Sequence, residues 1–254
     1  MSSRGSMDFL LAPTLEEFAH IVCFPVRDQV PYMGTVGFLE VALVAKTLRL
    51  KKNVVESNLR AKGNIIGFTS KFLFEKATLF ASSGSWDSFY VVFSLLIYGL
   101  IFFPNIEEFV NKTTVTIFIS RNLVSTLLAD VFFSFHWRNQ KRGGTINCCI
   151  PLLYKWILTH FPRRRPFVNN IGALKWSHRL MSLDAENVIL YYRDYDGVEP
   201  IYNCGDFHNV PLVSYKGGVI NYNPVLSLCQ LGYMLKEKPE ANLLEELKGL
   251  IMQI

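Results

Sequence analysis

The sequence predicts a mainly α protein, with a single helical domain around a buried apolar central helix and at most short strands near the C-terminal third. Hydrophobic residues make up 50% of the 254 residues, so the chain can bury a sizeable core and is not a disordered protein. The most apolar segment, Phe89–Phe103, has only Ser94 and Gly99 outside the apolar set. A run of this length, apolar on every face, is typical of a helix surrounded by other helices.

Helix signals recur through the first half of the chain. Thr14 and Glu17 match a capping box, which predicts a helix that ends near Cys23, just before Pro25. A second helix is expected near Phe38–Leu50, and the polar segment Lys51–Lys62 is expected to begin with another short helix. Apolar residues at helical spacing predict a helix over Thr69–Ala81.

The segment that follows the central helix contains both helix and strand signals. Asn105 can cap a helix that opens with Glu107 and Glu108, whose carboxylates suit the positive end of the helix dipole. The β-branched run Val115–Ile119 favours a strand. Asn122 then precedes an apolar stripe at helical spacing, which predicts a long helix as far as the next glycine pair.

The last third of the chain alternates helix signals with a loop-rich segment. Pro151 suits the first turn of a helix over Ile150–Phe161. Glycine, asparagine, tyrosine and proline are frequent from Tyr195 to Asn223, which predicts loops with at most short strands. Further helices are expected over Lys175–Leu183, Ala185–Tyr192, Pro224–Leu231 and Glu240–Ile251. With no internal repeat and no clear linker, we expect a flexible N-terminus over residues 1–12 and a single domain over residues 13–254.

The apolar central segment leaves a membrane span open as an alternative. At about 1.5 Å per residue, its fifteen residues extend roughly 23 Å as a helix, short of the roughly 30 Å hydrocarbon core of a bilayer. A core helix is therefore favoured over a single span at about residues 88–103. The five cysteines, an odd number, favour a reduced compartment, and no secretory signal is present, so we expect a nuclear or cytoplasmic protein.

Charge is distributed unevenly along the chain. The net charge is +5, yet residues 131–183 contain nine basic residues and no acidic one, whereas residues 184–254 carry five basic and ten acidic residues. The nine basic residues are Arg138, Lys141, Arg142, Lys155, Arg163, Arg164, Arg165, Lys175 and Arg179. Either the acidic C-terminal third neutralises them, or they form a surface for phosphate, on nucleic acid or on an anionic membrane.

Motifs of catalysis are absent from the sequence. It has no P-loop, no dinucleotide fingerprint and no hydrolase or zinc-protease signature, so we expect no cofactor and no enzyme activity. Cys148 and Cys149 are adjacent and do not match the spacing of metal ligands. Cys204, Asp206 and His208 alternate and would share one face of an extended segment, which leaves an enzyme that uses these three residues as a further alternative.

Several stretches resemble a plant domain of unassigned function that is abundant in legumes and related to the plant mobile domain, also labelled "aminotransferase-like". The stretches are PTLEEFAHIV at Pro13–Val22, GFTSKFLFEKA at Gly67–Ala77, SGSWDSFYVVFSLLIYGLIFFPN at Ser83–Asn105, NLVSTLLAD at Asn122–Asp130, and the later RNQKRGGTINCCIPLLYKW, LKWSHRLMSL and CGDFHNVPLVSYKGGVINYNPVLSLCQLGY. They follow one another in order over nearly the whole chain.

The resemblance implies a nuclear protein derived from a transposable element. It carries no catalytic residue over to this chain, and no lysine here has a context typical of pyridoxal phosphate. Related proteins continue into a polar region that favours coiled coils, so the resemblance implies that this chain stops before that region. We therefore expect a non-enzymatic module that binds nucleic acid or a protein partner, with its oligomeric state open.

Overall fold

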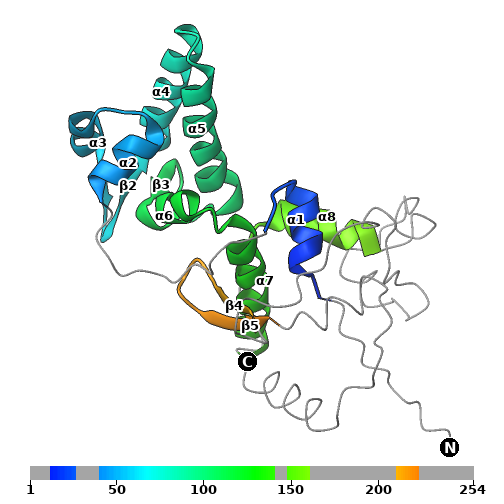
Figure 1. Cartoon of the computed structure of the whole chain (residues 1–254). Helices are drawn as coiled ribbons and strands as arrows, with labels where there is room; N and C mark the ends of the chain where they lie inside the picture. The colour runs from blue at the N-terminus through cyan, green and yellow to red at the C-terminus, as the bar shows by residue number, and fades with distance from the viewer. Residues whose placement is uncertain (1–11, 27–39, 141–147, 161–209, 223–254) are drawn as a thin grey trace, which may run out of the picture. The chain divides into compact units, whose positions relative to one another are not determined.

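The computed structural model describes residues 12–26, 40–140, 148–160 and 210–222. These residues form eight α-helices, one π-helical segment and five short strands in two antiparallel sheets, which confirms the mainly helical fold (Figure 1). The chain divides into two compact units. We name them the terminal unit (Met1–Pro25, Pro151–Asn209 and Asn223–Ile254) and the central unit (Val26–Ile150 and Val210–Tyr222). The expectation of one domain over residues 13–254 stays a prediction.

In the terminal unit, the structure describes helix α1 (Leu15–Val22) and nearly all of helix α8 (Ile150–His160). The capping box of α1 is confirmed, because the hydroxyl of Thr14 accepts a hydrogen bond from the backbone N–H of Glu17 (3.1 Å) and the Glu17 carboxylate accepts one from the N–H of Thr14 (2.9 Å). The helix ends near Cys23, as expected, and Cys23 caps it in a left-handed conformation. Helix α8 begins at Ile150 as predicted and continues to His160, the last described residue of its predicted range Ile150–Phe161.

The central unit begins with two short helices and a sheet. Helices α2 (Val41–Leu48) and α3 (Lys52–Asn58) precede the hairpin of β1 (Arg60–Lys62) and β2 (Ile65–Thr69). Strand β3 (Phe109–Asn111) pairs antiparallel with β2 and completes the order β1-β2-β3.

Gly67 on β2 allows this sheet to pack closely. A Cβ atom at this position would lie 2.2 Å from the carbonyl oxygen of Val110 on β3. Only glycine therefore fits where the two strands meet.

Helices α4 (Ser70–Ser82) and α5 (Trp86–Ile97) lie side by side, and α5 continues into the π-helical segment η1 (Tyr98–Phe102) (Figure 1). Gly99 lets η1 approach β3, since a Cβ there would lie 2.5 Å from the Val110 side chain. The core of the central unit is formed by side chains from α2 to α6 and from the sheet; its largest members are Phe68, Phe72, Leu48, Leu73 and Leu95.

The expected central helix is therefore present, with one side in the core and the opposite side exposed. Val92, Leu95 and Leu96 are buried, whereas Tyr90 and Phe93 are 60% and 42% exposed. The elements that contact this helix among the described residues, chiefly α4, α2, α6 and β3, pack against its buried side. Within the described ranges, every helix is too short or too polar to cross a lipid bilayer.

Two predictions for the segment after η1 are wrong. No helix follows Asn105, because Glu108 adopts a left-handed backbone (φ 55°) and β3 begins at the next residue. The β-branched run Val115–Ile119 lies in helix α6 (Lys112–Ser120) instead of a strand. The side chain of Asn111 accepts a hydrogen bond from the N–H of Thr114 (3.0 Å) and so caps this helix. The cap outweighs the low helix propensity of the β-branched residues.

The long helix expected after Asn122 is confirmed as α7 (Leu123–Gln140). The hairpin of β4 (Val210–Val213) and β5 (Val219–Tyr222) packs against it and confirms short strands in the loop-rich segment. The helices expected over Lys175–Leu183, Ala185–Tyr192, Pro224–Leu231 and Glu240–Ile251 lie outside the described residues.

Candidate functional site

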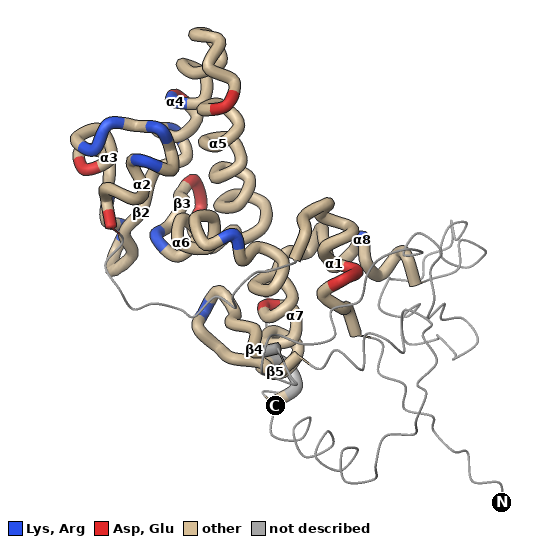
Figure 2. Tube along the Cα trace, viewed as in Figure 1, with Lys and Arg blue, Asp and Glu red and all other residues tan. Residues whose placement is uncertain are grey.

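A cationic surface covers two neighbouring helices of the central unit. We define the α2–α3 surface as Lys46, Arg49, Lys51 and Lys52, all of which are exposed. Lys46 lies in the last turn of α2 and Arg49 ends that helix, whereas Lys51 and Lys52 begin α3. Figure 2 shows these basic positions gathered along α2, the connection between the helices and the start of α3. Four positive charges from two elements thus share one surface.

The packing of α2 and α3 determines which side chains face outward. Val44 and Leu48 of α2 and Val55 of α3 are completely buried in the core. Because residues three and four apart lie on one face of a helix, burying this apolar face leaves the basic positions on the solvent side. The arrangement of the surface therefore follows from the core itself.

Two of the four cations have acidic partners. Arg49 forms a salt bridge with Asp87 (3.3 Å) and Lys52 forms one with Glu56 (3.7 Å), and all four side chains are more than half exposed. Exposed pairs of this kind contribute only about 0–1 kcal/mol, so a phosphate group can compete with them. Lys46 and Lys51 have no acidic partner in the part of the chain that the structure describes.

Of the nine residues predicted to bind phosphate, only two lie in described elements. Lys155 is exposed on α8, and Arg138 belongs to α7. The others, Lys141, Arg142, Arg163, Arg164, Arg165, Lys175 and Arg179, lie outside the described residues. The α2–α3 surface was not predicted, because residues 1–130 taken together are nearly neutral, with 12 basic and 11 acidic residues. A shorter window shows it, since residues 46–76 contain eight basic and two acidic residues.

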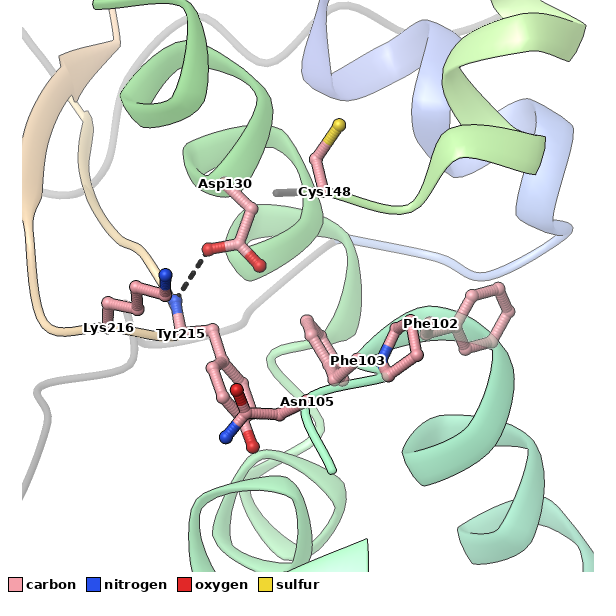
Figure 3. Close-up of a pocket in the computed structure, with 8 residues that line it drawn as sticks. Phe102, Phe103, Asn105, Asp130, Cys148, Tyr215 and Lys216 are labelled. Carbon is pink, nitrogen blue, oxygen red and sulfur yellow. Dashed lines mark hydrogen bonds between the residues drawn. The ribbon is translucent and has the colours of Figure 1, made fainter. Parts of the chain in front are cut away.

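A small polar hollow lies beside α7 in the central unit (Figure 3). Its lining comes from the end of η1 and the loop after it, from α7, from a cysteine two residues before α8 and from the β4–β5 turn; the polar members are Asn105, Asp130, Cys148, Tyr215 and Lys216. Asp130 accepts a hydrogen bond from the backbone N–H of Tyr215 (2.7 Å), which fixes the hairpin to α7. The ring of Tyr215 stacks on Phe103, with 5.3 Å between their centroids.

Burial controls the ionisation of this hollow. It raises the pKa of Asp130 from 3.8 to about 7, against the opposing effects of the Tyr215 N–H and the charge of Lys216. Burial also raises the pKa of the Cys148 thiol to about 12, with the nearby Asp130 adding to the increase. Since the thiolate is the reactive form of cysteine, Cys148 is a poor nucleophile at neutral pH.

The hollow is too small for a substrate. Its volume of about 20 Å³ is enough for about one water molecule, whereas small-molecule sites enclose roughly 300–1,000 Å³. The carboxyl group of Asp130 thus serves to hold the β4–β5 turn.

A second buried carboxylate joins the two described helices of the terminal unit. Glu17 of α1 accepts hydrogen bonds from the indole N–H of Trp156 (2.8 Å) and from the N–H of Thr14. Its other oxygen lies 3.0 Å from Nε2 of His160, and both side chains are fully buried. Trp156 and His160 also contact each other, with 4.9 Å between their ring centroids. This constellation joins residues about 140 positions apart in the chain and has no access for a substrate.

The described residues contain no group of three or more side chains suited to hold a metal ion. Cys148 and Cys149 are buried free thiols, and Sγ of Cys149 donates to the carbonyl of Ile101 (3.6 Å). The predicted alternative of Cys204, Asp206 and His208 lies outside the described residues.

Comparison with known proteins assigns the chain to a family. The model of the domain of unknown function DUF7745 matches residues 6–251. The chain belongs to this family. No curated protein and no solved structure matches the chain. The function of this DUF7745 domain must therefore be inferred from its own geometry. The features that bear on it are the α2–α3 surface, the hollow beside α7 and the Glu17 constellation.

Proposed function

We propose that this DUF7745 domain acts by binding nucleic acid and performs no catalysis. The α2–α3 surface carries the proposal, because it brings four exposed cations together and leaves Lys46 and Lys51 without acidic partners among the described residues. Lysine and arginine side chains that replace the counterions of a phosphate backbone supply most of the affinity of non-specific nucleic-acid binding. A surface of this kind binds the backbone without reading the base sequence.

The neighbours of these cations favour nucleic acid over a membrane. Asn53, Ser57 and Asn64 are the polar, exposed residues between and after them on α3 and on the β1–β2 turn. Amide and hydroxyl side chains hydrogen bond to phosphate and sugar oxygens. A membrane-surface helix would instead interleave its cations with several large exposed apolar residues, whereas α2 and α3 expose one, Leu43 (44%). We therefore choose nucleic acid and keep anionic lipid as an outcome of the experiment.

Binding without catalysis is supported by the surroundings of two buried carboxylates, Asp130 and Glu17. Asp130 lines a hollow with room for about one water molecule, and Glu17 lies among side chains that exclude solvent. The raised pKa of the Cys148 thiol removes the best nucleophile of the hollow.

The family resemblance and the basic segment of residues 131–183 add a location and a second surface to the proposal. The resemblance to the plant mobile domain favours a nuclear, transposon-derived protein, and a nuclear location would bring the domain to nucleic acid. The basic segment of residues 131–183 is proposed as a second surface that contacts phosphate, with Lys155 as its exposed member on α8. Binding of a protein partner is the second reading of the sequence, and the exposed side of α5 favours it.

The proposal is tested by fluorescence anisotropy of labelled 20-nucleotide DNA and RNA, single-stranded and double-stranded, with the full chain. The double variant Lys46→Glu/Lys51→Glu is expected to weaken binding roughly ten- to a hundredfold at 50 mM salt. It should also lower the slope of log K against log salt by about 2 for a duplex, because two phosphate contacts are lost.

Lys71→Glu provides a matched control, because it reverses one exposed charge on α4, outside the α2–α3 surface. Its affinity is expected to stay within about twofold of the wild type. Two results would contradict the proposal: affinity that the double variant leaves unchanged, or binding to phosphatidylserine vesicles in the absence of any binding to DNA or RNA.

A further inference from the structure

An apolar stripe runs along the exposed side of α5 and η1. We define the α5 stripe as Trp86, Tyr90, Phe93, Ile97, Leu100 and Ile101, which follow one another at intervals of three, four or one residue. This spacing places them on one face of a helix about 22 Å long, at about 1.5 Å per residue. Trp86, Tyr90 and Ile101 are 55%, 60% and 48% exposed. A helix that is apolar all round normally has partners all round, and here five of the six stripe side chains are exposed.

The aromatic end of the stripe is already ordered. Phe89, half buried behind it, stacks on Phe93 with 5.3 Å between centroids and makes edge contacts with Trp86 (5.8 Å) and Tyr90 (5.5 Å). Packed aromatic side chains lose little conformational entropy when a partner covers them, which is why Trp and Tyr dominate the centres of protein interfaces. The stripe therefore has the composition and the rigidity of an interface core.

We propose that the α5 stripe is the interface of a homodimer, in which the stripe of one copy packs against the stripe of a second. Its five most exposed side chains are about half exposed. At roughly 200 Å² for a side chain of this size, they offer roughly 500 Å² of apolar surface. A standard dimer interface buries about 800 Å² on each partner, of which about 65% is apolar in homodimers. The exposed apolar area thus equals what a second copy would cover.

The charge of the stripe favours a second copy over a charged partner. From Trp86 to Ile106 the only charged residue is Asp87, and this carboxylate pairs with Arg49 away from the stripe. A two-fold interface brings each patch against itself, so a charged patch would repel its own copy. A neutral apolar patch is complementary to itself. Phe93 lies at the middle of the stripe, where a two-fold axis would bring it against its counterpart.

Sedimentation velocity of the full chain over a range of concentrations tests the dimer. The wild type is expected to show a reversible monomer–dimer equilibrium, and Phe93→Glu should weaken it at least about a hundredfold, because two carboxylates would meet in an apolar interface. Phe93→Leu, which keeps an apolar side chain, should retain the dimer. Ile66→Glu is the matched control, since Ile66 is 50% exposed on β2, outside the stripe, and this variant should also dimerise.

Circular dichroism of each variant distinguishes loss of the dimer from loss of the fold. The Lys46→Glu/Lys51→Glu variant should dimerise like the wild type, so failure of the nucleic-acid proposal and failure of the dimer are distinguishable. A wild type that stays monomeric up to about 100 μM overturns the proposal, because an interface of this size predicts tighter association. A folded Phe93→Glu variant that dimerises normally overturns it as well. So does a wild type that is monomeric in solution but sediments with phosphatidylcholine vesicles, which would assign the stripe to lipid.

Discussion

Two buried carboxylates among the described residues, Glu17 and Asp130, are held in opposite ways. Glu17 accepts hydrogen bonds from the indole N–H of Trp156 and the backbone N–H of Thr14, and Nε2 of His160 lies 3.0 Å from its other oxygen. Asp130 has one short backbone donor, the N–H of Tyr215, and a lysine near its charge. A buried carboxylate with several partners holds elements together, whereas burial with few partners raises the pKa of a carboxyl group. The comparison predicts that Glu17 is essential to its unit and that Asp130 makes the stability of its unit depend on pH.

The largest expected effect comes from Glu17→Ala. Removing the carboxylate leaves the indole N–H of Trp156 without its buried acceptor, removes the cap on the N–H of Thr14 and leaves a cavity beside His160. Together these losses should lower the free energy of unfolding by about 3–5 kcal/mol. Urea denaturation followed by tryptophan fluorescence measures this. Glu75→Ala, on the exposed side of α4, is the matched control and should change stability by less than about 0.5 kcal/mol. An equal loss of unfolding free energy in the two variants would contradict the structural role of Glu17.

Asp130→Asn is expected to remove a pH dependence. Because burial raises the pKa of Asp130 to about 7, the folded chain holds a proton that the unfolded chain has released above pH 3.8. The contribution of Asp130 to stability is therefore complete below about pH 4, and it is lost as the pH rises toward and through 7. The loss amounts to at most roughly 4 kcal/mol.

Asparagine keeps an oxygen for the Tyr215 N–H but cannot ionise. The variant should therefore be more stable than the wild type at pH 8 and similar to it at pH 4.5, as measured by urea denaturation at both values. If the unfolding free energies of the wild type and the variant changed in parallel between pH 4.5 and pH 8, ionisation of Asp130 would not affect the stability of the fold.

Trp156→Phe should have a smaller effect than Glu17→Ala. It keeps the aromatic ring against His160 and removes only the indole donor, so we expect a loss of about 1–2 kcal/mol. Differential scanning calorimetry of the full chain checks this value. A cost as large as that of Glu17→Ala would mean that the ring packing, and not the donor, dominates.

The smallest expected effect belongs to Lys216→Met. The charge of Lys216 lowers the pKa of Asp130, so its removal should move the midpoint of the pH dependence upward, by less than about one pH unit for an exposed lysine. The same urea series over pH, with Asp130→Asn as the flat reference, measures the midpoint. A downward displacement would contradict the assigned role of Lys216.

Much of the local structure follows from adjacent residues. The capping box of Thr14 and Glu17 and the start of α8 at Pro151 are set by a few neighbouring positions, and both were predicted. By contrast, the left-handed backbone of Glu108 and the cap at Asn111 decide whether the next residues form a strand or a helix. Stronger signals in the same segment, the candidate cap at Asn105 and the β-branched run Val115–Ile119, predicted the opposite. Secondary structure can thus be predicted from adjacent residues where a single signal dominates.

The functional surfaces could not be predicted from the sequence without the fold. The partners of Glu17 come from α8, and no spacing rule links them to α1. The segment Phe89–Phe103 is apolar on all faces in sequence, so its pattern could not show which side would stay exposed. The α2–α3 surface was detectable as a local excess of lysine and arginine, yet only the burial of Val44 and Leu48 shows that the basic residues face outward.

Lysine-specific chemical labelling with mass spectrometry, with and without a 20-nucleotide DNA, shows directly whether nucleic acid covers the α2–α3 surface. We expect DNA to protect Lys46 and Lys51 and to leave Lys71, also exposed, as reactive as before. Full reactivity of Lys46 and Lys51 in a saturated complex would contradict the claim that the α2–α3 surface binds nucleic acid.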